Sequence, residues 1–199
     1  SLMQAAGDGY FILPNTISNY LSGELNTPKI DTGRPEFEEA VKSSVERLKK
    51  LLSVNGRQPA SSFHKKLGKI MWDHVGMVRN EAGLLKALEL VKELRDEFWR
   101  DLKVTGGINE VNQELEKAGS VADILEMADL LITYALNRKE SCGAHFREEY
   151  QTPDGEAKRN DAEYAYVAVW EYAGDGKQPI LHKEELKFET VELKERSYK

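Results

Sequence analysis

The feature that most constrains the fold of this chain is a helical repeat of apolar residues in four stretches between residues 35 and 137. In each stretch, apolar side chains recur at steps of three or four residues, so they fall on one face of a helix. The first stretch opens at Pro35, which suits a first helical position, and ends at Asn55-Gly56. Apolar faces joined by short connections must be buried against one another. The sequence therefore predicts an antiparallel bundle of three to four helices.

The four apolar faces define the expected core of this bundle. Its expected members are Phe37, Val41, Val45, Leu48, Leu52, Phe63, Leu67, Ile70, Met71, Val75, Val78, Leu84, Leu88, Val91, Leu94, Phe98, Leu102, Val121, Ile124, Leu125, Ala128, Leu131, Ile132 and Ala135. Each large apolar side chain that is buried contributes about 1.5–3 kcal/mol before the entropy cost is subtracted. The fourth stretch has a clear start pattern, because Ser120 suits the N-cap and Asp123 the position three residues later.

The carboxyl-terminal part of the chain has the pattern of extended structure. Residues 161–172 are rich in Tyr and Val, and the turn-forming sequence Ala173–Lys177 follows them. A second extended run is expected from Ile180 to Leu193, with apolar residues at roughly alternate positions. An isolated two-stranded ribbon is only marginally stable in water, so we expect it to lie against other parts of the protein.

The sequence thus predicts a mainly α protein with three parts. Residues 1–30 contain an apolar opening segment, residues 31–140 form the helical bundle, and residues 141–199 form an extended, β-hairpin-like tail. The opening segment has no cap or polar lead-in. We therefore expect the chain to be part of a larger protein.

Composition excludes several classes of protein. With 40% apolar and 31% charged residues, the chain has the composition of a globular protein. Its net charge of −6 argues against a nucleic-acid partner, because phosphate binding needs clustered Lys and Arg. The single cysteine, Cys142, excludes an internal disulfide and indicates a reducing compartment.

Motifs of catalysis and metal binding are missing from the sequence. It contains no G-x-G-x-x-G, no phosphate-loop motif and no H-E-x-x-H. None of the four histidines has a Glu three residues before it, as the di-iron bundle signature requires. One cysteine cannot form a thiolate zinc site. We therefore predict no catalytic residue and no metal ligand.

The segment from Arg138 to Tyr150 concentrates charged groups where the last long helix gives way to irregular chain. Its residues Glu140, His145, Arg147 and Glu149 favour an ion-pair and hydrogen-bond cluster that fastens the helix end to the tail. A catalytic acid/base pair is the alternative, and it requires a surrounding cleft. Cys142 beside His145 also raises a nucleophile–base pair, although such pairs are assembled by the fold and not by short sequence distance.

Five segments resemble the flavoprotein subunits of succinate dehydrogenase and fumarate reductase. Arg138–Arg147 resembles the family signature R-K-E-S-R-G-A-H-x-R, and Phe63–Arg79 contains its helix pattern L-x-x-x-M-x-x-x-x-G-x-x-R. Lys158–Asp161 is similar to the R-[DN]-D step that follows the signature, and Arg196–Tyr198 to the R-x-Y ending. Ser1–Met3 is similar to the S-L-[LM] of the flavin domain. These segments cover almost the whole chain in the family order.

The chain departs from the family pattern at two positions. Cys142 stands where Arg is usual, and Glu149 stands where Asp is common. The first change removes one guanidinium group from the charged segment. The ion pairs there must therefore differ in detail from those of the family.

The resemblance implies a carboxyl-terminal fragment, in which residues 1–30 are the last helix and exit of a flavin-binding domain. Ser1 and Leu2 match the family's flavin contact. FAD would be bound by the parent protein and is not expected to be bound by this fragment alone. Glu140, His145 and Arg147 would be structural residues at the domain junction.

The parent reaction implied by the resemblance is hydride transfer between FAD and the C2–C3 bond of succinate or fumarate. The implied partners are the chain's own upstream flavin domain, an iron–sulfur subunit and a membrane anchor subunit. The implied location is cytoplasmic, peripheral on the inner face of the cell membrane. Two alternatives stay open: a fragment of an L-aspartate oxidase-type flavoprotein, and a non-catalytic helical interaction module.

Overall fold

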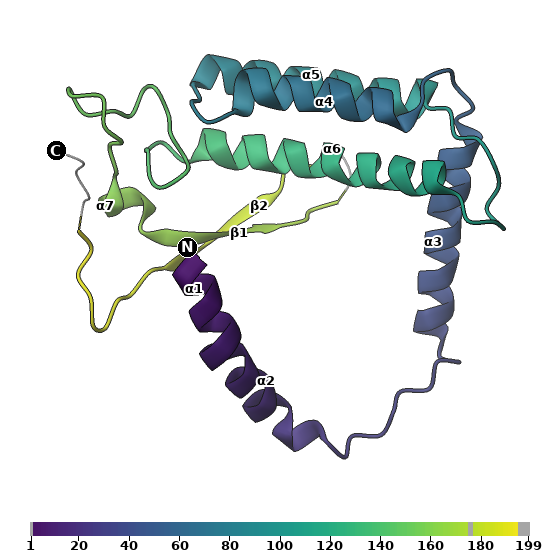
Figure 1. Ribbon diagram of the computed structural model, residues 1–199, viewed down its shortest axis with the longest axis horizontal. Coiled ribbons are helices and arrows are strands. Elements are labelled where there is room, and N and C mark those ends of the chain that lie inside the picture. Colours follow the sequence, from purple (N-terminus) through teal and green to yellow (C-terminus); the bar gives the residue numbers. More distant parts are fainter. Residues whose placement is uncertain (1, 175–176, 195–199) are drawn as a thin grey trace. The chain divides into compact units, whose positions relative to one another are not determined.

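A computed structural model describes residues 2–174 and 177–194 of the chain (Figure 1). The prediction of a mainly α protein with a helical bundle and a carboxyl-terminal hairpin is confirmed. Contacts between residues divide the chain into two units, one up to Val45 and one from Glu46 onward. The three-part division at residues 30 and 140 stays a prediction.

The amino-terminal unit contains a continuous series of short helical elements. These are α1 (Leu2–Gly7), the π-helical turn η1 (Asp8–Ile12), α2 (Leu13–Leu21) and the 3-10 turn η2 (Ser22–Glu24). None of their described residues is buried, and many are apolar. The stability of this unit therefore comes from local backbone hydrogen bonds and not from a core.

The widened turn before α2 has a local cause. Pro14 lies in the first turn of α2 and lacks the N–H that would bond to the carbonyl four residues earlier. The side chain of Asn15 donates to the Phe11 carbonyl at 2.7 Å. The Asn15 side chain thus adds a bond to the carbonyl next to the one that Pro14 cannot serve.

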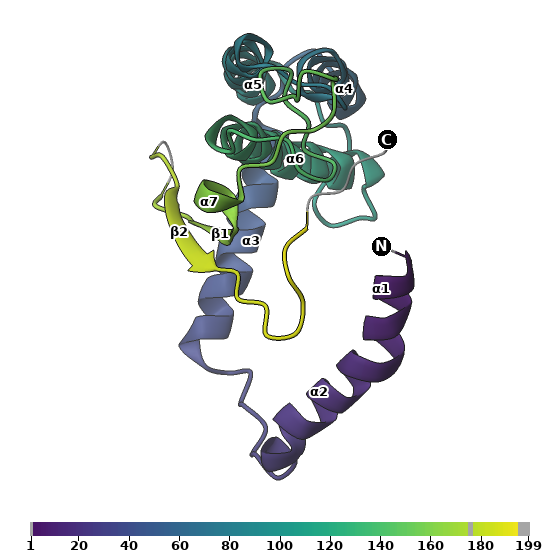
Figure 2. The same cartoon turned by 90° about the vertical axis from the view of Figure 1, so that its left-hand side faces the viewer.

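The second unit contains the bundle. Helix α3 (Pro35–Ser53) crosses the unit boundary, and α4 (Ala60–Val75), α5 (Glu81–Asp101) and α6 (Gln113–Asn137) follow it. In both views α4, α5 and α6 lie side by side along their lengths (Figures 1 and 2). From α4 to α6, successive helices run in opposite directions (Figure 1). The end of α4, the start of α5 and the end of α6 therefore lie at the same end of the bundle.

The core of the bundle is formed by the predicted apolar faces. Phe63 and Phe98 are fully buried and meet edge to face, with ring centroids 5.3 Å apart. Leu51, Leu125 and Ile132 are also 0% exposed. The carboxyl-terminal end of α3 contributes Leu51, with Leu48 and Leu52 packed against the core.

Where α3 ends, the chain passes very close to the end of α5. A Cβ atom at Gly56 would lie 2.2–2.3 Å from the backbone of Asp101, so only glycine fits this position. The Gly56 amide donates to the Leu102 carbonyl at 2.7 Å, and the Lys103 amide donates to the Gln58 carbonyl at 2.7 Å. The Asn55-Gly56 sequence therefore ends α3 and joins it to α5.

Four residues that were predicted to be in the core are exposed. Val78 is 58% exposed because α4 ends at Val75, three residues before it. Phe37 and Val41 lie on the part of α3 that precedes the bundle, and they are 42% and 63% exposed. Leu131 is 44% exposed because α6 uses its neighbour Ile132 for the core. The helical pattern of apolar residues therefore includes positions at which no described neighbour buries the side chain.

The predicted start of the fourth helix is wrong. Helix α6 begins at Gln113, and Ser120 lies inside it. The side chain of Asn112 accepts from the Leu115 amide at 3.0 Å and is the true N-cap. Leu115 and Ala118 are buried, so the apolar face starts five residues before Ser120.

The tail forms a two-stranded antiparallel ribbon. Strands β1 (Tyr166–Glu171) and β2 (Ile180–Glu185) pair over their whole lengths, with Val169 opposite His182. The nucleus of the predicted hairpin is thus present. Part of its turn, residues 175–176, lies outside the described residues.

Both predicted strands were too long. Residues Asp161–Tyr164 form the helical turn α7, in which the Asn160 carbonyl accepts from the amides of Glu163 and Tyr164. The second strand ends at Glu185, and the expected Leu186, Phe188 and Val191 lie beyond it. These three apolar residues continue the alternating pattern of β2, but they are not part of a strand.

Candidate functional site

The candidate site is the segment that follows α6, residues 138–160, which we call the elbow. It runs across the ends of α4, α5 and α6 before the chain enters α7 (Figure 2). Four of its polar or charged residues are buried, with exposed fractions between 0% and 9%: Glu140, Ser141, His145 and Arg147. Since buried charge is costly unless it is paired, the partners of these groups explain why the elbow has this shape.

The elbow and α7 supply donors to the carboxyl-terminal carbonyl groups of α6. The last four carbonyls of a helix have no partner within it, and they carry partial negative charge. The Ala135 carbonyl accepts from the guanidinium Nη1 of Arg147 at 2.8 Å. The Asn137 carbonyl accepts from the hydroxyl of Tyr164 at 3.3 Å. A buried positive charge at this helix end is therefore stabilised by the helix itself.

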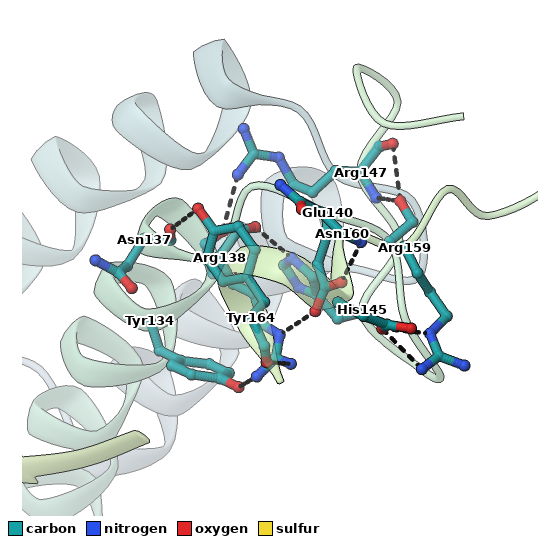
Figure 3. A network of polar contacts seen from close by, with 12 residues as sticks. Tyr134, Asn137, Arg138, Glu140, His145, Arg147, Arg159, Asn160 and Tyr164 are labelled. Atoms are coloured by element: carbon teal, nitrogen blue, oxygen red, sulfur yellow. Dashed lines mark hydrogen bonds and ion pairs between the residues drawn. The ribbon is translucent and has the colours of Figure 1, made fainter. Parts of the chain in front are cut away.

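Arg138 and Glu140 form a buried ion pair, in which Nε of Arg138 lies 2.7 Å from the carboxylate (Figure 3). Arg138 also donates to the Tyr134 hydroxyl at 2.7 Å and to the Tyr164 carbonyl at 3.0 Å. Burial alone would lower the pKa of Arg138, but the hydrogen bonds to Glu140 and Tyr134 raise it. The arginine thus stays charged between α6 and α7.

Both carboxylate oxygens of Glu140 are used. One accepts from Arg138, and the other accepts from the backbone amide of Asn160 at 2.8 Å. The first residues of the elbow are thereby tied to its last. This contact fixes the separation between the end of α6 and the start of α7.

Ser141 and Arg147 close a small loop inside the elbow. The Ser141 Oγ accepts from the Arg147 amide at 2.8 Å and donates to the Arg147 carbonyl at 3.1 Å. Between them, Cys142 and His145 exchange two backbone hydrogen bonds, and Gly143 adopts a φ of 60°. This left-handed conformation favours glycine, so the glycine of the signature is required by the turn.

His145 has a partner on each ring nitrogen. Nε2 lies 2.9 Å from the Arg138 carbonyl, which can only accept, and Nδ1 lies 3.1 Å from Nη1 of Arg79, which can only donate. Burial lowers the pKa of His145 below its ordinary value of 6.5, and the nearby guanidinium groups lower it further. The ring is therefore neutral, with its proton on Nε2.

The elbow is joined to the connection between α4 and α5 by backbone hydrogen bonds. The Arg79 amide donates to the Phe146 carbonyl at 3.1 Å, and the Glu148 amide donates to the Arg79 carbonyl at 2.8 Å. Burial, with the charge of Arg147, lowers the pKa of Arg79. These contacts form a short parallel bridge between two distant segments.

Glu149 links the same connection to Arg147. Its carboxylate accepts from Nε of Arg147 at 3.1 Å and from the backbone amide of Glu81 at the start of α5. Burial by itself would raise the pKa of Glu149, but these hydrogen bonds hold it below its ordinary value of 4.5. A carboxylate at a helix start is also favoured by the helix dipole.

The contacts of the elbow suit a structural role. Both ring nitrogens of His145 and both oxygens of Glu140 are engaged by neighbours, so neither group is available as an acid or base in this arrangement. The Cys142–His145 contact is made by backbone atoms. Among the described residues, no group of three or more His, Cys, Asp or Glu is placed to hold a metal ion.

The predicted flavin contacts lie at the amino end. Ser1 falls outside the described residues. Leu2 is 87% exposed in a unit whose described residues include none that is buried. Leu2 and its surroundings therefore do not enclose an isoalloxazine ring, and no chemical step through FAD can be derived from this chain.

A groove lies at the opposite end of the bundle, with a volume of about 490 Å³. It runs between the first turns of α4 and the amino-terminal half of α6. Its lining residues are Ser61, His64, Gln113, Glu116, Lys117, Ser120, Val121 and Ile124. It shares no residue with the elbow.

Several residues of the site carried no predicted role. Ser141 and Asn160 lie inside the two quoted motifs, but their importance comes from one hydroxyl and one backbone amide. Arg79 ends the helix motif, and only the fold brings it to His145. The motifs themselves were the available signal. The side-chain chemistry alone did not distinguish these residues.

Comparison with known proteins identifies relatives for the whole chain. A family model described as the fumarate reductase flavoprotein C-terminus matches residues 64–198. The succinate dehydrogenase flavoprotein subunit of Bacillus subtilis is 26% identical over 198 residues, which are 100% of this chain and 32% of that protein. An uncharacterised FAD-dependent oxidoreductase of Methanocaldococcus jannaschii is 34% identical over 113 residues, covering 57% of this chain and 20% of that protein.

Solved structures share the fold. A variant of the Escherichia coli quinol fumarate reductase superposes with a TM-score of 0.67 at 24% identity, over 81% of this chain and 27% of that chain. Adenylylsulfate reductase of Archaeoglobus fulgidus superposes with a TM-score of 0.61 at 17% identity, over 94% of this chain and 29% of that chain. The chain thus spans about a third or less of the length of these proteins.

Proposed function

This chain belongs to the fumarate reductase flavoprotein C-terminal family, and we propose that it is the helical, carboxyl-terminal part of an FAD-dependent oxidoreductase subunit that interconverts succinate and fumarate. The observation that carries the proposal is the match of the family model over residues 64–198, which include most of α4, all of α5 and α6, and the elbow. The named relatives include both succinate dehydrogenase and fumarate reductase flavoprotein subunits.

In this proposal the chain supports catalysis and does not perform it. The flavin and the substrate would be bound by an upstream domain, with Ser1 and Leu2 approaching the flavin. The elbow supports this division of labour, because Glu140, His145 and Arg147 are buried among residues of the bundle and the tail. Their role would be to fix the shape of the bundle end that faces the flavin domain.

The proposed partners are an iron–sulfur subunit, to which electrons pass, and a membrane anchor subunit. The parent protein would then be cytoplasmic and peripheral on the inner face of the cell membrane. Every helix in the described part of the chain is too short or too polar to cross a bilayer. In this proposal the other subunits attach the parent protein to the membrane.

The test is to recover the native polypeptide from its cells with an antibody raised against the bundle. We expect a polypeptide about three times as long as this chain, with bound flavin and succinate-dependent reduction of a dye. Malonate, a competitive dicarboxylate, should suppress the activity. A dye or oxygen reduction that requires L-aspartate would favour the L-aspartate oxidase alternative. A colourless native polypeptide without either activity would contradict the proposal and favour an interaction module.

A further inference from the structure

His145 is the point where two separate parts of the fold meet. One ring nitrogen bonds to the end of α6 through the Arg138 carbonyl, and the other bonds to the α4–α5 connection through Arg79. The histidine is only 9% exposed. Its two bonds run beside the backbone bridge between Arg79 and Arg147. The state of this ring therefore bears directly on the attachment of the elbow to the bundle.

These two bonds are compatible with one protonation state only. The Arg138 carbonyl needs a proton on Nε2, and the Arg79 guanidinium needs a lone pair on Nδ1. A second proton on the ring would place N–H against N–H at a distance of 3.1 Å. It would also add a positive charge beside the charge of Arg79. Protonation must therefore break the contact between His145 and Arg79.

Burial and three guanidinium groups oppose protonation, and together they outweigh the hydrogen bond to the Arg138 carbonyl, which by itself would raise the pKa of His145. Arg79 approaches from the α4–α5 connection, Arg138 from the end of α6, and Arg147 from the elbow itself. The carboxylates of this region are already bonded elsewhere. Glu140 is bonded to Arg138, and Glu149 to Arg147 and to the start of α5. Glu148 accepts from the side chain of Asn80. None of these contacts offers a protonated His145 a free carboxylate.

We propose that His145 is a pH-sensitive switch, which joins the elbow to the α4–α5 connection while its ring is neutral and releases this connection when the ring is protonated. The switch acts on the hydrogen bonds of Arg79 with His145, Phe146 and Glu148. It would make the shape of this bundle end respond to acidification. No feature of the flavoprotein assignment is needed for this inference.

The direction of the pH effect follows from linkage. Burial and the neighbouring charges keep the folded-state pKa of His145 below its ordinary value of 6.5. The unfolded chain therefore binds more protons between the two pKa values, and the free energy of unfolding falls as the pH is lowered through about 6.5. Glu149, whose pKa is also lowered, acts at a lower pH, below its ordinary value of 4.5. The loss of stability caused by His145 therefore begins at a higher pH than the loss caused by Glu149.

The experiment compares the full 199-residue chain with its His145→Gln variant. Glutamine keeps one donor and one acceptor but does not titrate. Urea unfolding is measured between about pH 7.5 and about pH 5.5, the range in which histidine titrates. We expect the midpoint of the wild-type chain to fall by roughly 0.5 M over this range, in line with typical urea slopes. The variant should show less than about half of this change. The matched control, His64→Gln at an exposed histidine, should keep the wild-type dependence.

A second measurement stays valid if the glutamine variant does not fold. The imidazole nitrogen shifts of the wild-type chain are recorded by NMR across the same range, together with the amide signals of Arg79 and Glu148. We expect Nε2 protonation at high pH, and amide signals that move together with the titration of His145. Equal pH dependence of wild type and His145→Gln would overturn the proposal. A ring that protonates without moving these amide signals would also overturn it.

Discussion

The elbow and the β1–β2 ribbon are neighbours in the chain. Charged residues of the elbow are buried, whereas apolar residues of the ribbon are exposed. In the elbow, Glu140 and Arg147 are each 1% exposed. In the ribbon, Val167 and Val169 are 45% and 50% exposed. The difference shows that burial here follows the supply of partners and not hydrophobicity alone. The helix ends offer carbonyl and amide groups to the elbow, whereas the ribbon meets few apolar surfaces on its second face.

The largest expected effect is that of Arg147→Ala, which tests whether the buried charge of the elbow is essential. The change leaves the Ala135 carbonyl and the Glu149 carboxylate without their arginine donor. Removing this fully buried side chain leaves a cavity and an unpaired helix carbonyl, which together should cost about 2–5 kcal/mol in the free energy of unfolding by urea. The control Arg95→Ala breaks a half-exposed pair with Asp129 and should cost less than about 1 kcal/mol. Similar costs for both variants would remove the distinction between elbow and surface.

A smaller effect is expected for Ser141→Ala, which isolates one hydroxyl of the elbow. Its Oγ satisfies both the amide and the carbonyl of Arg147, and the side chain is 0% exposed. Leaving these groups unpaired should cost about 1–3 kcal/mol in the free energy of unfolding. The control Ser120→Ala, at an exposed site inside α6, should be within about 0.5 kcal/mol of wild type. A cost at Ser120 like that of a lost N-cap would contradict the observed start of α6.

Acid should also destabilise the elbow through Glu149, beginning at a lower pH than the effect of His145. The hydrogen bonds from Glu81 and Arg147 keep the pKa of Glu149 below its ordinary value of 4.5. The stabilisation by Glu149 is therefore present above this value and is lost as the pH falls through the folded-state pKa. Thermal melts of wild type and Glu149→Gln should converge at low pH and differ at neutral pH. Parallel curves over the whole range would refute this assignment.

The smallest effect is expected in the ribbon, for Val169→Thr. This residue is half exposed on the outer face, opposite His182, and Thr keeps the β-branched shape. The free energy of unfolding should stay within about 0.5 kcal/mol of wild type. By contrast, Tyr166→Ala at the 7% exposed position of the same strand should cost several times more. A large loss for Val169→Thr would indicate that this face is covered after all.

Much of the bundle could be predicted from the sequence, because helix periodicity reports which face will be buried. Pro35 opens α3 as expected, and Phe63, Phe98 and Ile132 are in the core. The errors occur where a local sequence pattern is compatible with two different structures. Ser120 has a good capping pattern, but Asn112 caps a longer helix that also buries Leu115. The role of Ser1 and Leu2 at a flavin stays a prediction.

The charged residues of the elbow could be identified, but not their partners. The sequence places Glu140, His145 and Arg147 at the end of a helix, and this location alone favours an ion-pair cluster. It does not show that Arg147 bonds to a helix carbonyl or that Glu140 bonds to a backbone amide twenty residues later. Almost every residue has a backbone donor and a backbone acceptor. The sequence therefore does not indicate which of these groups bond to the charged side chains.

The sequence by itself determined the presence of the four long helices, most of their apolar faces and the position of the charged turn, since these depend on residues three or four places apart. Only the tertiary structure decided the protonation state of His145. Its partner Arg79 is 66 residues away, and it reaches the ring because α4 and α6 end at the same side of the bundle. The physical reason is that a hydrogen bond depends on distances of a few ångströms in space, which packing sets and local sequence does not.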